Sequence, residues 1–545
     1  MITDNKRKIS LSYIYAAAVT ALLLLLAAWH FLDIKAAVAE CGDGFLAVNY
    51  LLLTAYLAAV CGLAWYLIRV KKAAYHVTAG ILIMLLGGAN IFVFKGLSAP
   101  DEVSHYISAY KLSNELLHMP VTDEYGQVYV RACDLYLEDT KGRMDEVRAA
   151  NEAGIEDFDR NLVIFGQTLD EEVYRVYHDG LPESRQDAGG TALSCQWTVG
   201  TTPAAYIPQA LGISLARIIG LGPLGLISLG KLFNLMFFAL MTSCAVYIIP
   251  KGRDIMCSAA LLPMMLHLAG SMSYDVFAAA CSFMFIALII NIRDEGGSLK
   301  KYIAAALVLA LLAPCKLVYS LLIMLILMLI CTGDRKKRRE YMIFGICCLL
   351  LAGISMYAVN SAVISGYASA EETVIEWAEE AEGYTLSYLL HRPVELIGIF
   401  YRSFMMMSGN WFATMFGIYL GNQDPVLNVP YPLIGLLAAG LMLIAAGSDI
   451  RLGARGRCVA AAVSLAVLAA LMGSMLIAYT PMSSPYIQGV QGRYLLPVLP
   501  LILMCIPGDY ISVRKSASGI VLWTFITAES FVLIRVFATV ALRIG

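Results

Sequence analysis

The sequence predicts an all-α polytopic membrane protein that crosses the bilayer about 13 times (range roughly 11 to 14), with a large extracytoplasmic loop carrying juxtamembrane helices. Hydrophobic residues make up 59% of the 545 residues and charged residues only 15%, whereas soluble chains average about 25% charged residues. The charges are also segregated, because residues 101–190 hold 20 Asp and Glu against 8 Lys and Arg. This composition excludes a cytosolic enzyme, a secreted disulfide scaffold, a disordered chain and a nucleic-acid binder.

The apolar stretches are numerous enough to form such a bundle. A spanning helix needs roughly 20 mostly apolar residues to cross a hydrocarbon core about 30 Å thick. The run 203–220 is expected to be re-entrant or to lie flat, because a span there would reverse the side on which every later loop lies. The predicted spans are 11–32, 46–68, 77–95, 225–248, 255–270, 273–292, 302–314, 316–331, 341–361, 430–447, 458–479, 494–507 and 517–540.

Lys and Arg orient the predicted bundle, since short cytoplasmic loops carry an excess of these residues. With the N-terminus placed inside, every cytoplasmic loop holds at least two of them, and the acidic loop lies outside. The residues that set this orientation are Lys6, Arg7, Lys8, Arg69, Lys71, Lys72, Lys251, Arg253, Arg293, Lys300, Lys301, the run from Arg335 to Arg339, Arg451, Arg455, Arg457, Arg514 and Lys515.

Five segments follow from these boundaries. Transmembrane helices are expected at both ends and in the middle of the chain, separated by two extracytoplasmic segments. The apolar stretch 394–420, in the second of these, has no clear place in the topology. The predicted segments are 1–97 (transmembrane), 98–224 (acidic loop with juxtamembrane helices), 225–361 (transmembrane), 362–429 (extracytoplasmic) and 430–545 (transmembrane).

The first candidate site residues follow the third predicted span. Pro100, Asp101 and Glu102 begin a predicted helix over 101–112, and acidic residues suit the first turn of a helix. A spacing of four residues places Asp101 beside His105. We therefore expect a carboxylate pair with a histidine nearby at the outer membrane surface, although a helix cap alone would also account for Asp101.

Three further positions fall at outer ends of spans, where isolated ionisable residues are candidates for function. Asp275 is the one acidic residue in a long apolar region, and Lys316 follows Pro314, which breaks an apolar run. Arg493, in the segment Gln491–Tyr494, carries a planar guanidinium suited to phosphate. The alternatives are a helix cap for Asp275, a snorkelling lysine, and an Arg and Tyr anchor at the interface.

Missing motifs also constrain the function. The sequence contains no Walker A motif, no GxGxxG after a strand, no HExxH and no GxSxG. An enzyme with this sequence would therefore take an activated donor from the membrane itself.

Taken in order, these short motifs resemble a bacterial multi-pass membrane family of unknown function, which in turn resembles the GT-C class of integral-membrane glycosyltransferases. The resemblance covers roughly residues 75–540. More than one predicted span precedes the acidic motif, where that class usually has a single one, and this is a departure from the class. The motifs are Ala99–Glu102 with His105, Ala109 and Tyr110; Pro203 with Tyr206, Ile207 and Pro208; Ser273 with Asp275; Lys316 with Tyr319; and Gln491–Tyr494 with Pro497.

The resemblance implies an inverting glycosyltransferase in the bacterial plasma (inner) membrane, with its N-terminus cytoplasmic. It would move a sugar from a polyprenyl-phosphate donor to an extracytoplasmic glycan, lipid or protein of the cell envelope. By position, Asp101 is the expected catalytic base and Glu102 the second choice, while His105 orients the carboxylate or touches the acceptor. No cofactor is certain, and a divalent cation (Mg or Mn) would fall to the same two carboxylates. The expected donor-phosphate ligands are Arg493, Lys316, Tyr494 and Tyr319, with Asp275 and Gln491 as further candidates.

Other functions remain open at this stage. A polysaccharide polymerase or ligase would use similar residues, a secondary transporter would place ionisable residues near the bilayer midplane, and a non-enzymatic assembly subunit would need none of them. Sugar, acceptor, linkage, metal dependence and oligomeric state do not follow from the sequence.

Overall fold

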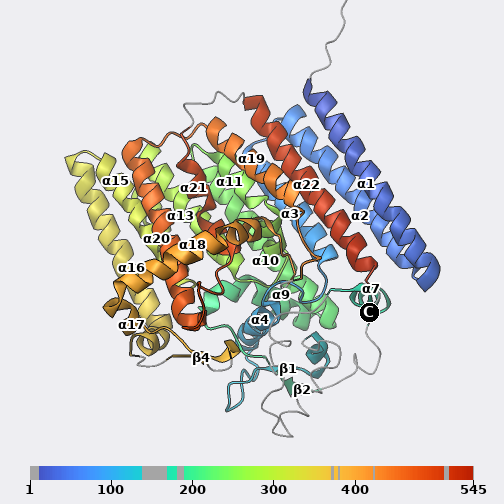
Figure 1. The fold of residues 1–545 in the computed structure, drawn as a ribbon, viewed down its shortest axis with the longest axis horizontal. Helices are drawn as coiled ribbons and strands as arrows, with labels where there is room; N and C mark the ends of the chain where they lie inside the picture. The colour runs from blue at the N-terminus through green and yellow to red at the C-terminus, as the bar shows by residue number, and fades with distance from the viewer. Residues whose placement is uncertain are drawn as a thin grey trace, which may run out of the picture.

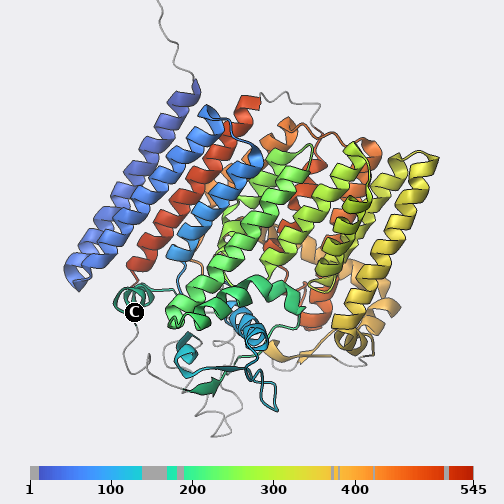
Figure 2. The ribbon, with the colours of Figure 1, turned by 180° about the vertical axis from the view of Figure 1, so that it is seen from behind.

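A computed structural model shows a mostly helical protein with two very small sheets (Figures 1 and 2). Most helices run side by side in one bundle, and short helices and both sheets gather at the end of the bundle where α3 ends. We call this the loop end. The residues described are 11–137, 169–180, 190–194, 196–369, 373–378, 381–421, 424–507 and 515–543.

Within these residues, eight helices are long and apolar enough to cross a membrane. Each predicted apolar stretch falls on one of these helices or on shorter apolar helices, which confirms the prediction of a helical protein with many membrane-type helices. The eight are α1 (Leu11–Cys41), α2 (Gly44–Trp65, continued by the π-helix η1, Tyr66–Val70), α3 (Tyr75–Val93), α10 (Pro223–Ile248), α13 (Asp275–Glu295), α16 (Arg335–Ser369), α20 (Ala454–Tyr479) and α22 (Lys515–Ala541).

Shorter helices complete the bundle, and several of them are broken in the middle. Proline explains two of the breaks, because it lacks the backbone N–H that a continuous helix needs: Pro263 begins α12, and Pro497 and Pro500 fall at the junction of η6 and α21. The shorter elements are α11 (Arg253–Ala260) with α12 (Pro263–Ala269), α14 (Leu299–Leu312), η4 (Leu317–Leu325) with α15 (Ile326–Thr332), α19 (Tyr431–Gly447), and η6 (Gly492–Val498) with α21 (Leu499–Met504).

Helix α13 forms the centre of the bundle. The most apolar window of α13 is 100% buried inside the protein, against 17% for α1 and for α16. It packs against α10, α12, α14, η4 and η6. The first residue of α13, Asp275, therefore lies at the loop end with protein on all sides.

The loop end is built from short elements between the spans. The run 203–220 forms η3 (Pro203–Tyr206) and α9 (Ile207–Ile218), and a helix of 12 residues is too short to cross the bilayer. This agrees with the expectation that the run does not span. The other elements here are α4 (Glu102–Leu116), β1 (Tyr129–Arg131), η2 (Ala132–Leu137), α7 (Glu171–Asp179), β2 (Thr191–Leu193), β3 (Val374–Ile375), η5 (Glu376–Ala378), β4 (Ala381–Glu382) and α17 (Leu386–His391).

Both sheets are antiparallel pairs. In the first, Tyr129 of β1 pairs with Leu193 of β2, and in the second, Val374 of β3 pairs with Glu382 of β4. Within the predicted acidic loop 98–224, residues 138–168, 181–189 and 195 lie outside the described residues.

The apolar stretch 394–420 had no place in the predicted topology, and the structure gives it one. Most of it is helix α18 (Pro393–Phe416), which packs along η6. The hydroxyl oxygens of Ser403 and Thr414 on α18 accept the backbone N–H groups of Ile487 and Gly492, both at 2.8 Å. Helix α18 is thus the support for the segment that contains Arg493.

The close approach of α18 to Gly492 gives a testable prediction. A Cβ atom at Gly492 would collide with the carbonyl oxygen of Trp411 and crowd the backbone of Met415. We expect Gly492→Ala to separate η6 from α18 and to lower the unfolding temperature of the detergent-purified protein by several degrees. Gly435→Ala is the matched control, since no atom lies within 4 Å of a Cβ there. Equal melting temperatures for the two variants would contradict this packing.

Candidate functional site

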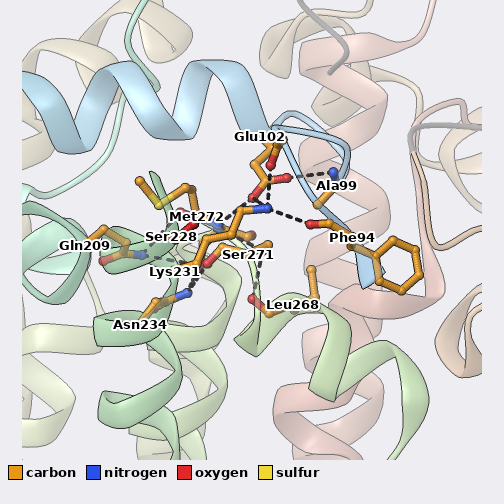
Figure 3. Close-up of polar contacts among 12 residues, drawn as sticks. Phe94, Ala99, Glu102, Gln209, Ser228, Lys231, Asn234, Leu268, Ser271 and Met272 are labelled. Carbon is orange, nitrogen blue, oxygen red and sulfur yellow. Dashed lines mark hydrogen bonds and ion pairs between the residues drawn. The ribbon is translucent and has the colours of Figure 1, made fainter. Parts of the chain in front are cut away.

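A buried ion pair joins three helices at the loop end (Figure 3). Glu102, the first residue of α4, is completely buried, and Nζ of Lys231 on α10 lies 3.0 Å from its Oε1. Lys231 also donates to the carbonyl oxygens of Phe94 (3.1 Å) and Gly96 (2.6 Å), and Oε2 of Glu102 accepts the N–H of Ala99 (2.7 Å). The pair therefore ties the end of α3 and the start of α4 to α10.

Side chains of α4 and α10 also hold the turn between α12 and α13 (Figure 3). Oε1 of Glu102 accepts the backbone N–H of Met272 at 2.9 Å. From α10, the side chain of Asn234 donates to the carbonyl oxygens of Ser271 (2.7 Å) and Ser273 (3.3 Å). Helix α13 begins just after this turn, so its first residue takes its position from the turn.

Four charged side chains meet next to this turn, and we call them the ionic cluster: Asp101, Asp275, Lys316 and Arg493. Arg493 Nη2 lies 2.9 Å from Asp101 Oδ2, and its Nε lies 3.5 Å from Asp275 Oδ2. Lys316 Nζ lies 2.5 Å from Asp275 Oδ1. The cluster thus gathers side chains from four separate parts of the chain, and its formal charges cancel.

Tyrosine rings surround the two cations. Lys316 Nζ lies 4.9 Å from the ring centre of Tyr274 and 4.3 Å from that of Tyr494, and the guanidinium of Arg493 lies 5.3 Å from the Tyr494 ring. At such distances a ring face attracts a cation. The hydroxyl of Tyr319 donates to the carbonyl oxygen of Tyr494 at 2.7 Å and so fixes that residue.

Exposure separates Asp101 from the rest of the ionic cluster. Its side chain is 40% exposed, against 4% for Arg493, 11% for Asp275 and 18% for Lys316. A molecule arriving from outside the protein therefore meets Asp101 first. The two cations lie behind it, in surroundings of lower polarity where charge interactions are stronger.

The backbone of Asp101 is in an uncommon conformation. Its φ of 57° and ψ of 18° lie in the left-handed region, which Asp, Asn and Gly tolerate better than other residues. Although it occupies the N-cap position of α4, its side chain makes no capping hydrogen bond. The alternative of a simple helix cap does not hold for its carboxylate, which is directed to Arg493 instead.

His105 is placed beside two tyrosines. Its Nδ1 shares a hydrogen bond of 2.7 Å with the hydroxyl of Tyr206, and the ring of Tyr274 packs edge-on at 5.1 Å. Burial lowers the pKa of His105 to about 4, which outweighs the opposing effect of the nearby Asp101 and Asp275 charges. The imidazole is therefore neutral at pH 7, and its side-chain partner is Tyr206, where the sequence predicted Asp101.

The expected carboxylate pair does not form. The Asp101 carboxylate pairs with Arg493. Both carboxylate oxygens of Glu102, in contrast, contact buried partners. Glu102 is thus a structural residue, and a cation bound between these two carboxylates does not fit the geometry. Among the described residues there is no group of three or more His, Cys, Asp and Glu that could hold a metal ion.

The remaining candidates lie around Arg493. Tyr494 and Tyr319 contact the cations or each other, as described, so the structure brings both to the ionic cluster. Gln491 occupies the N-cap position of η6, and its carbonyl oxygen accepts the N–H of Tyr494 at 3.1 Å. Its role in the structure is to begin η6, one residue from the contact between Gly492 and Thr414.

The sequence analysis missed Lys231 and Asn234. Lys231 lies inside the predicted apolar stretch 225–248, and a lysine inside a membrane helix marks a buried partner or a function. That signal was present in the sequence. Asn234 carries a weaker one, because a single amide in a helix has many structural explanations.

Comparison with known families identifies the chain. The family described as "Predicted membrane protein (DUF2142)" matches residues 82–502, which include α4, the ionic cluster and α18. The chain belongs to this DUF2142 family. No curated protein and no solved structure matches it. Membership in DUF2142 establishes a membrane protein and assigns no activity.

The Glu102–Lys231 pair predicts a strong loss of stability when either partner is removed. Breaking a buried ion pair costs about 3–5 kcal/mol, because the remaining charge has no counterion. We expect Lys231→Met alone to destabilise the protein by this amount in reversible denaturant unfolding. The double variant Lys231→Met with Glu102→Gln should be more stable than the sum of the single changes predicts. Lys251→Ala, at an exposed position, is the control, and an additive double variant would exclude the pairing.

The buried His105 predicts a loss of stability in mild acid. Its pKa is about 4 in the folded protein, against 6.5 for an ordinary histidine. Between these values the unfolded chain binds a proton that the folded chain excludes, so stability falls as the pH drops from 6.5 towards 4. Melting temperatures at pH 7 and pH 5 should therefore differ more for the wild type than for His105→Gln. Identical shifts would show that other groups cause the acid sensitivity.

Proposed function

We propose that this protein is a GT-C-type membrane glycosyltransferase that moves a sugar from a polyprenyl-phosphate donor to an extracytoplasmic acceptor of the cell envelope. The observation that carries the proposal is the ionic cluster. It places an exposed carboxylate, Asp101, directly in front of two enclosed cations, Arg493 and Lys316. A base and a pair of cations are what transfer from a phosphate leaving group requires.

The proposed topology has 13 spans in the bacterial plasma membrane, with the N-terminus in the cytoplasm. The positions of charges along the helices support it. Helix α13 begins in the ionic cluster with Asp275 and ends beside Arg293, one of the residues predicted to lie in the cytoplasm. The ionic cluster then faces the extracytoplasmic side, and the donor's lipid tail lies in the bilayer.

The proposed reaction is a single inverting displacement. The acceptor hydroxyl oxygen attacks the anomeric carbon, and Asp101 takes the hydroxyl proton. The bond between the anomeric carbon and the phosphate oxygen breaks, and its electron pair leaves with the polyprenyl phosphate. General-base assistance of this kind contributes roughly 10²–10⁴-fold to the rate.

The two cations act on the leaving group. Charge develops on the phosphate oxygen as its bond to the sugar breaks, and fixed positive groups in a dry environment stabilise it. Arg493 supplies a planar fork of donors and Lys316 a point charge. Both are held in place by Asp275 and by the tyrosine rings, so little reorganisation is needed during the reaction.

This proposal predicts that Arg493 binds the lipid phosphate. In nanodiscs, we expect the purified wild-type protein to bind polyprenyl phosphate saturably, and Arg493→Ala to bind it at least tenfold more weakly, which corresponds to about 1.4 kcal/mol. Arg493→Lys keeps the charge and should retain part of the affinity. The control is Arg175→Ala, since Arg175 forms an exposed ion pair with Asp43 away from the ionic cluster. Absence of saturable binding, or equal binding by Arg493→Ala, would favour a transporter or a scaffold over the enzyme.

A further inference from the structure

We infer that the Arg493–Asp101 ion pair is a resting contact that the donor phosphate must displace, so that donor binding releases the catalytic base. This inference rests on the proposed function and concerns the regulation of the same site. It starts from one distance, the 2.9 Å between Arg493 Nη2 and Asp101 Oδ2.

The reaction geometry requires these two groups to separate. In an inverting displacement, the acceptor and the leaving group lie on opposite sides of the anomeric carbon. The base lies within about 3.2 Å of the acceptor oxygen, and the reacting atoms start about 3–3.5 Å apart. A base and a phosphate-binding cation on opposite sides of the sugar are then several ångströms apart. The contact in the structure leaves no room for the sugar between them.

Arg493 is the fixed member of the pair. It is 4% exposed, its guanidinium lies against the Tyr494 ring, and its Nε faces Asp275 at 3.5 Å. Its backbone belongs to η6, which is anchored to α18 through Gly492 and Thr414. Movement of Arg493 would break several buried contacts at once.

Asp101 is the member that can move. Its side chain is 40% exposed and makes no capping hydrogen bond with α4, and among the described residues Arg493 is its one ion-pair partner. The solvent-facing side of its carboxylate can be hydrated as soon as the contact with Arg493 is lost. The carboxylate can therefore rotate away from Arg493 towards the solvent, provided that another anion takes its place beside the buried guanidinium.

A donor phosphate supplies that anion. Its oxygens can accept the hydrogen bonds of Arg493 that Asp101 gives up, while Asp275 continues to hold Arg493 and Lys316 from the buried side. The positive charge remains neutralised, and the freed carboxylate becomes available for the acceptor proton. Arg493 thus makes donor binding a condition for an active base, which favours binding of the donor before the acceptor.

Competition between Asp101 and the donor phosphate for Arg493 predicts a change in donor affinity that a purely catalytic role of Asp101 does not predict. Asp101→Asn removes the negative charge that competes for Arg493, and Asn tolerates the left-handed backbone at this position. We expect this variant to bind polyprenyl phosphate about threefold or more tightly than the wild type, while transferring no sugar. Asp101→Gly also accepts a φ of 57° and should bind more tightly for the same reason.

Asp43→Asn is the matched control, because Asp43 also pairs with an arginine at 2.7 Å, outside the ionic cluster. Its affinity should equal that of the wild type. Melting temperatures of all variants report on folding. If Asp101→Asn and Asp101→Gly fold but bind polyprenyl phosphate no more tightly than the wild type, the inference is overturned. If the wild type and Arg493→Ala bind it equally well, the proposed function itself is overturned.

Discussion

The ion pair between Glu102 and Lys231 is the contact on which the arrangement of the loop end depends. It connects the end of α3 and the start of α4 to α10, and its carboxylate also holds the turn that leads into α13. Buried ion pairs often add little net stability, because desolvation opposes their attraction. Here the pair fixes geometry. Because both charges are enclosed, few other arrangements of the α12–α13 turn would leave them paired and hydrogen-bonded. That turn sets the position of Asp275, which comes directly after it.

The two cations of the ionic cluster are positioned in a different way. Lys316 and Arg493 both stand at the start of broken spans, where a short 3₁₀ segment precedes the next helix. Irregular backbone in a membrane protein requires protein around it, since lipid cannot satisfy free backbone groups. Helix α18 meets part of this need by accepting two backbone N–H groups of the 484–493 region. The irregular segments then carry cations where a regular helix would carry apolar side chains.

Sequence reasoning found much of this site for a simple physical reason: a charge at the end of an apolar helix is costly, so Asp101, Asp275, Lys316 and Arg493 stood out against their surroundings. It failed where the pattern was ambiguous. Helical spacing could not show that the left-handed backbone of Asp101 turns its carboxylate away from Glu102. The place of α18 was also hidden, because the groups it supports, such as Gly492, lie far along the chain.

The enclosure of α13 separates the site from the membrane around it. Peripheral helices such as α1 and α16 present most of their surface outward, and in a bilayer of unmatched thickness such helices respond by tilting or bending. Helix α13 has no face on the lipid within its apolar window. The residues at the N-terminal end of α13 therefore keep their distances from one another when the thickness or composition of the bilayer changes. The outer helices accommodate the difference in thickness by tilting or bending.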